Sequence, residues 1–252
     1  MDRKSAAAQK EDAALSKILA IFGGACVVEI LLLIVNRFYG DVGTFLPTYY
    51  ALRAVRYLAL AGVALGVLFA LLRRKAKGFW LGVGVAVSCA AAFAAVLFID
   101  WMYPYGAQYL CVVVPVAALL GIVYYIYQLE FFVCAAMEAV SLAALWAVRR
   151  SAAPLANARI LAVAVVAALL IAAAVGFSLL LKSRGGRLTR KKSAPVIFPA
   201  RTDYRLIPVS GALGLAALAL GLFAGPAVAM YAMICLAAYL FVLAVYFTVR
   251  LM

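Results

Sequence analysis

The chain has 252 residues, of which 69% are hydrophobic and 13% are charged, and its formal net charge is +14. Soluble domains are about 45–50% apolar, so this composition excludes an ordinary soluble protein. The apolar residues form long runs separated by short polar breaks, and a helix that crosses a bilayer needs about 20 apolar residues. The sequence therefore predicts an all-α, polytopic integral membrane protein.

Eight apolar runs follow a polar segment, residues 1–17, along the chain. Runs of this length are helices, because every backbone polar group inside the hydrocarbon must be paired within its own segment. Residues 1–17 are predicted to be cytoplasmic, residues 18–127 to form the first four spans and residues 128–252 the last four. The predicted spans are 18–36, 53–72, 79–99, 107–127, 131–148, 160–181, 206–224 and 227–249.

Basic residues are concentrated in alternate breaks between the spans. If residues 1–17 are cytoplasmic, 17 of the 23 basic residues lie inside, and every lysine is among them. The excess of Lys and Arg on cytoplasmic loops therefore predicts that both termini are cytoplasmic. For the basic breaks 73–77 and 182–205 both to lie inside, the chain must cross the membrane an even number of times between them. The long apolar stretch 107–148 is therefore predicted to form two spans joined by a tight turn at Gln128–Glu130. Short loops and the lack of an N-x-[ST] sequon favour the plasma membrane of a bacterium.

The two halves of the chain resemble each other in layout. Each begins with a span that carries one central glutamate, and outer arginines and a proline follow before the next span. Four spans in each half would give both halves the same orientation, as in transporters built from parallel repeats. The sequence thus raises the possibility of a 4+4 internal repeat. The alternative is a chance match, which alanine-rich sequence produces easily.

Glu29 and Glu138 are the main candidate functional residues. Each lies inside an apolar run, about 10–16 Å from its end at 1.5 Å per residue. A carboxyl group in hydrocarbon is costly, and such residues often carry protons or bind substrates. The structural alternative is a protonated glutamate that is hydrogen-bonded to a neighbouring helix. Its expected partners are a backbone carbonyl or Ser88, Ser141, Ser178 or Tyr57.

Six arginines on the predicted outer side form a second candidate site. Arginine binds phosphate and carboxylate through a planar fork, so an anionic headgroup or solute is a conceivable ligand. The structural alternative is that these side chains extend from helix ends toward water. The six residues are Arg37, Arg53, Arg56, Arg149, Arg150 and Arg159.

The longest break, Lys182–Arg205, carries eight basic residues and one acidic residue, Asp203. Anionic lipid attracts such segments, and a soluble cytoplasmic partner is a second conceivable ligand. The topological bias in basic residues explains the same charges without a partner. Nucleic acid is not expected, because no basic module with interleaved aromatic residues is present.

No enzyme class is indicated, and neither a cofactor nor a metal ion is expected. The chain has no histidine and no recognised catalytic motif, and its five cysteines all lie inside apolar runs. Two main functions are compatible with these features, and a histidine-free lipid-modifying enzyme is the third and least favoured. The first is a small transporter, or the membrane subunit of a transport complex, with Glu29 and Glu138 near the midplane. The second is a non-transporting scaffold or assembly factor that binds a partner through Lys182–Arg205.

Overall fold

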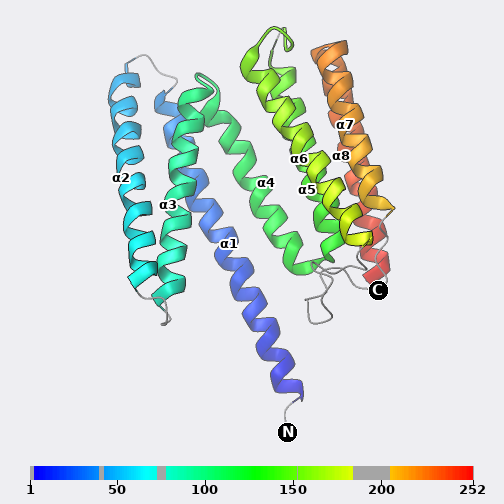
Figure 1. Cartoon of the computed structure of the whole chain (residues 1–252), viewed down its shortest axis with the longest axis horizontal. Coiled ribbons are helices and arrows are strands. Elements are labelled where there is room, and N and C mark those ends of the chain that lie inside the picture. The colour runs from blue at the N-terminus through cyan, green and yellow to red at the C-terminus, as the bar shows by residue number, and fades with distance from the viewer. Residues whose placement is uncertain (1–2, 40–42, 73–77, 152, 184–204, 252) are drawn as a thin grey trace. The chain divides into compact units, whose positions relative to one another are not determined.

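The computed structural model describes residues 3–39, 43–72, 78–151, 153–183 and 205–251, which form eight helices and no strand (Figure 1). All eight are long and apolar enough to cross a bilayer. The predicted all-α, polytopic membrane fold is therefore confirmed. The helices are α1 (Arg3–Tyr39), α2 (Phe45–Leu72), α3 (Gly78–Trp101), α4 (Gly106–Ile126), α5 (Leu129–Arg149), α6 (Ala158–Ser183), α7 (Leu206–Ala224) and α8 (Pro226–Leu251).

Two helices begin well before the predicted start, whereas the other helices begin within two residues of it. α1 begins at Arg3 rather than at residue 18, because the polar segment 1–17 contains five alanines and three lysines, which favour helix. α2 begins at Phe45 rather than at Arg53. Pro47 is the third residue of α2, in the first turn, where its missing N–H costs no helical hydrogen bond. Arg53 and Arg56 consequently lie inside α2 rather than at its start.

The turn between α4 and α5 has only two residues. α4 ends at Ile126, Gln128 has an extended backbone conformation (φ −66°, ψ 148°), and α5 begins at Leu129. This break confirms the predicted division of the stretch 107–148 into two spans. It also places the carboxyl end of α4 beside the amino end of α5.

The chain forms two compact units, each described here by itself. The α2–α3 unit comprises Gly23–Pro115, and the α5–α8 unit comprises Met1–Phe22 with Val116–Met252. Their boundaries fall inside α1 and α4, so these units differ from the predicted halves 18–127 and 128–252. The structure does not confirm the internal repeat, which stays a prediction.

The α2–α3 unit is held together by close contact between its two named helices. A Cβ atom on Gly66 would lie 2.8 Å from the backbone nitrogen of Ala86, and one on Gly82 would lie 2.7 Å from that of Ala70. Only glycine permits this approach of two helix backbones. Next to this contact is a small core from α1, α2, α3 and α4 that contains Leu32, Tyr39, Leu52, Val96, Ile99 and Ala107.

The α5–α8 unit is built around α5, which packs against α6, α7 and α8. More than half of the apolar segment of α5 is buried, and no other span is buried to the same extent. The side of α7 that faces α5 consists of small residues. A Cβ atom on Gly214 would clash with Ser141 Oγ, and one on Gly221 would lie 2.6 Å from Leu145 Cδ2. Small residues thus let α7 approach α5 closely along its length.

Candidate functional site

Glu138 lies in the middle of α5 and has no exposed surface. Neither of its two carboxyl oxygens has a hydrogen-bond partner. Buried polar groups in proteins are almost always hydrogen-bonded, and each exception calls for an explanation. Glu138 therefore fits neither expectation from the sequence fully. A transport site needs accessible surface, which Glu138 lacks in this conformation, and a structural glutamate needs a hydrogen-bond partner, which its carboxyl oxygens also lack.

Three of the hydroxyl groups that the sequence offered as partners bond instead to their own helices. Ser141 Oγ donates to the carbonyl of Met137 at 2.9 Å, and Ser178 Oγ donates to that of Val175 at 2.7 Å. Ser88 Oγ in the other unit donates to its own helix in the same way. None of these serines is hydrogen-bonded to Glu138. The structural alternative therefore lacks the serine partners that it predicted for this glutamate.

The polar neighbours of Glu138 come from α5, α7 and α8. Cys134 lies one turn before it on the same face of α5 and is fully buried. Its thiol bonds to Ser210 on α7, and Ser210 Oγ lies 2.9 Å from Tyr239 Oη on α8. Cys134 and Tyr239 both interact electrostatically with Glu138. Glu138 is therefore adjacent to a small polar cluster inside an otherwise apolar unit.

Sequence reasoning did not single out this cluster, although one signal was available. Glu130, Cys134 and Glu138 recur at intervals of four residues, which places all three on one face of a helix. That spacing predicts a polar line along α5. The partners Ser210 and Tyr239 had no comparable signal, because lone hydroxyl residues occur on most of the spans.

An ion pair lies at the end of the same face of α5. Arg250 Nη1 on α8 donates to Glu130 Oε2 at 3.3 Å. Glu130 is 2% exposed, whereas the Arg250 side chain is 25% exposed and reaches the surface. Next to the pair, Tyr127 Oη and Thr248 Oγ1 are 3.1 Å apart. These contacts fasten the amino end of α5 to the carboxyl end of α8.

Glu29, the second predicted carboxylate, lies in the α2–α3 unit and has a different environment. Its side chain is only partly buried, and its Oε2 atom has no hydrogen-bond partner. Cys111 on α4 interacts with it through a side-chain hydrogen bond. The two glutamates thus lie in separate compact units, and only Glu138 is enclosed on all sides.

The six predicted outer arginines are divided between the two units, three in each. In the α2–α3 unit, Arg37 and Arg53 are exposed, and Arg56 lies 5.9 Å from the centre of the Phe93 ring. Arg53 also bonds to Tyr57 one turn later. Contacts with a tyrosine on the same helix and with a phenylalanine on α3 are typical of arginines near a membrane surface.

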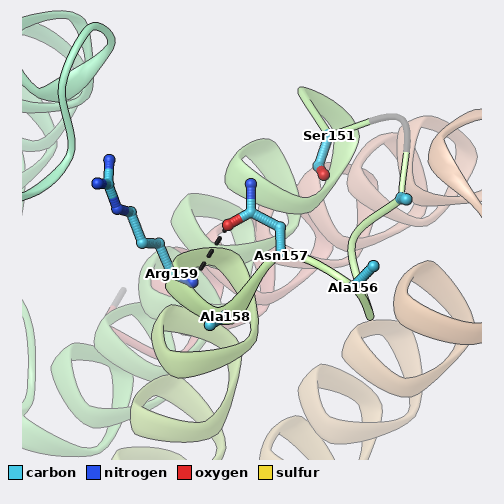
Figure 2. Close-up of a pocket in the computed structure, with 6 residues that line it drawn as sticks. Ser151, Ala156, Asn157, Ala158 and Arg159 are labelled. Atoms are coloured by element: carbon cyan, nitrogen blue, oxygen red, sulfur yellow. Dashed lines mark hydrogen bonds between the residues drawn. The ribbon is translucent and has the colours of Figure 1, made fainter.

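The arginines of the α5–α8 unit lie around the loop between α5 and α6. Arg150 stacks over Trp146, 4.7 Å from the ring centre, and Asn157 Oδ1 accepts a hydrogen bond from the Arg159 backbone nitrogen. Figure 2 shows that the Arg159 side chain points away from Ser151. The open pocket here, of about 550 Å³, is lined by Ser151, Ala153, Ala156, Asn157, Ala158 and Arg159.

The remaining candidate, the basic loop Lys182–Arg205, falls mostly outside the described residues, because residues 184–204 are among those not described. Within the described ranges, no group of three or more His, Cys, Asp or Glu side chains is arranged to hold a metal ion. Comparison of the sequence with known protein families, with curated proteins and with solved structures found no match.

Proposed function

We propose that the protein is a proton-coupled membrane transporter, or the membrane subunit of a transport complex, and that Glu138 carries the coupling proton. The observation that supports this proposal is the fully buried carboxyl group in the middle of α5, with both oxygens unpaired. A glutamate retained for structure would form hydrogen bonds that offset the cost of burying it. A proton carrier instead needs a carboxyl group that no permanent partner occupies.

Burial inside a helical unit also suits the transport cycle. A carboxyl group that is neutral can remain in an apolar environment, whereas the ionised form requires water or a cation nearby. Glu138 in this conformation has neither water-accessible surface nor a cationic side chain bonded to it. We therefore assign the conformation to an occluded state in which Glu138 is protonated.

The proposed setting is the plasma membrane of a bacterium, with the α4–α5 turn on the cytoplasmic side. The distribution of basic residues supports this orientation, since every lysine then lies inside. A cysteine placed at Gln128 should react with impermeant maleimide only in inverted vesicles, and one placed at Ala156 only in intact cells. The reverse pattern would contradict the proposed orientation.

The function can be tested before the transported solute is known. Purified protein in liposomes on a solid-supported membrane should give a transient current after a pH jump, because protons bind inside the protein. Glu138→Gln should abolish this current, whereas the matched control Ser141→Ala should retain it. Panels of amino acids, sugars, and organic and inorganic ions would then identify the solute through sustained currents. An unchanged transient in Glu138→Gln would favour the scaffold alternative.

A further inference from the structure

The buried titratable residues of α5 lie in only one half of the helix. Glu130, Cys134 and Glu138, here called the α5 polar stripe, are each 2% exposed or less and follow one another at intervals of one turn. From Glu130 to Glu138 the stripe spans about 12 Å of helix axis. The Ser210–Tyr239 pair lies beside it at the level of Cys134.

The other half of α5 contains no such groups. Beyond Ser141, whose hydroxyl is used by the Met137 carbonyl, the buried residues are apolar. A proton moves through hydroxyl, carboxyl and water groups, not through packed hydrocarbon. The buried apolar residues between Ser141 and the end of α5 are Ala144, Leu145, Ala147 and Val148.

At its polar end the stripe lies against Arg250, whose side chain reaches the surface. The Glu130 carboxyl is buried, and the partly exposed guanidinium of Arg250 lies against it. Figure 1 shows this end of the α5–α8 unit, where the α4–α5 turn and the end of α8 meet, opposite the α5–α6 loop and the α7–α8 turn. The ion pair thus occupies the position from which water would reach the stripe.

From this geometry we infer that, in this conformation, Glu138 exchanges protons only with the compartment at the α4–α5 turn, along the α5 polar stripe, and that the Glu130–Arg250 ion pair gates this path. The inference rests on the proposed function of Glu138 and adds the side of access and its regulation. When the pair opens, a hydronium ion transfers one proton to the Glu138 carboxylate and leaves water. In this conformation the reverse step returns the proton to the same compartment, and release to the other side requires a second conformation of the transport cycle.

The titratable groups near this path are few. α5 contributes Glu130 and Cys134, α8 contributes Tyr239 and Arg250, and Tyr127 lies next to the ion pair. α7 has no titratable residue, and α6 has only Arg159 and Lys182 near its two ends. The remaining titratable residues of α5 and α8 are Arg149, Tyr231, Cys235 and Tyr246. Of these, Cys134 and Tyr239 interact with Glu138 directly. Proton exchange at Glu138 should therefore depend mainly on the state of the ion pair.

Dicyclohexylcarbodiimide provides a test that does not require transport. This apolar reagent modifies protonated carboxyl groups, and mass spectrometry of peptides reports the rate at Glu138 and at Glu29 separately. Spheroplasts and inverted vesicles would be labelled with the bath at two pH values, and a cysteine at Gln128 would identify which bath contacts the α4–α5 turn. Starting from an alkaline bath, in which the Glu138 carboxyl is ionised, labelling of Glu138 should rise severalfold when the bath on that side is acidified, and should not respond to the other bath.

The gate is tested with variants of the ion pair. Glu130→Gln should speed labelling of Glu138 about fivefold at constant pH, because a partly exposed ion pair contributes an interaction of that order. Arg250→Gln should have the same direction of effect, and Arg250→Lys should restore the slow rate. Thr248→Val, which removes a neighbouring hydrogen bond and spares the pair, is the matched control and should leave the rate unchanged.

Each result bears on a distinct claim. Labelling that follows the bath at the α5–α6 loop, or neither bath, would overturn one-sided access. One-sided labelling with no change in Glu130→Gln and Arg250→Gln would overturn the gate. If Thr248→Val sped labelling equally, loosening of the helix ends would explain the effect and the gate would again be wrong. Labelling of Glu29 should stay constant in all variants. The pH-jump current of Glu138→Gln tests the proposed transport function, and the labelling rates test the side of access and the gate.

Discussion

The surroundings of Glu29 and Glu138 differ although the two residues look alike in the sequence. Each is a single glutamate within an apolar helix, but Glu29 is partly buried next to Cys111, whereas Glu138 is fully enclosed by α6, α7 and α8. The difference arises from packing, since α5 is the central helix of its unit. An intramembrane carboxyl group is therefore a functional candidate only once its enclosure is known.

The largest contrast between the two sites is expected when each glutamate is replaced by lysine. An unpaired charge at Glu138 would cost several kcal/mol, a large part of the stability of an ordinary protein. Lysine at Glu29 can extend toward the surface. Glu138→Lys should thus yield little folded protein, while Glu29→Lys stays folded with a lower Tm. Size-exclusion chromatography and a thermal melt in detergent measure both, and equal behaviour would contradict the difference in burial.

A second contrast concerns the glycine contacts of the two units. Gly214→Ala should destabilise the α5–α8 unit by about 1–3 kcal/mol, because the new Cβ atom would overlap Ser141 Oγ. Combining it with Ser141→Ala should recover most of this loss, since the Ser141 Cβ atom would then be 3.5 Å away, an ordinary contact. Urea or thermal unfolding of the single and double variants tests this coupling.

The corresponding substitution in the α2–α3 unit should have no such rescue. Gly66→Ala would bring a Cβ atom within 2.8 Å of the backbone nitrogen of Ala86, which no side-chain change can remove. Gly84→Ala is the matched control, because nothing lies within 4 Å of its added Cβ atom. That variant should be neutral or slightly stabilising through helix propensity. A destabilised Gly84→Ala would show that the contacts of α3 differ from those described.

An effect of similar size is expected at the Glu130–Arg250 pair. Arg250→Gln leaves the Glu130 carboxyl, which is 2% exposed, without its charged partner, and should lower stability by about 1–3 kcal/mol. Glu130→Gln keeps a hydrogen-bond acceptor for Arg250 and should cost less. Arg150→Gln, which removes an arginine stacked over Trp146, is the control at the other end of the unit. A Tm for Arg250→Gln no lower than that for Arg150→Gln would argue against the ion pair.

The smallest effect on stability is expected from Glu138→Gln. No hydrogen bond to the carboxyl oxygens is lost, so the free energy of unfolding should change by less than about 1 kcal/mol. Glu29→Gln should be similarly mild, since glutamine can still accept from Cys111. A loss of more than about 2 kcal/mol in Glu138→Gln would show that the carboxyl group has a structural role and would weaken its assignment as a proton carrier.

The sequence alone determined the membrane fold, the eight spans and the break at Gln128, because the thickness of the hydrocarbon sets the length of every apolar run. It also identified both glutamates, since a carboxyl group stands out in such a run. It predicted the start of α2 eight residues too late, because Pro47 and the aromatic residues after it resemble a loop. In the structure Pro47 is accommodated in the first helical turn.

Only the tertiary structure decided which glutamate is enclosed and which distant residues meet. Apart from the polar stripe of α5 and the polar start of α1, the faces of these helices are apolar, so the hydrophobic pattern does not distinguish a face that contacts lipid from one that contacts protein. The glycines of α7 allow close approach to α5, and this packing encloses Glu138. The pairing of Glu130 with Arg250, 120 residues apart, depends on how α5 and α8 pack, because no local rule links residues at that separation.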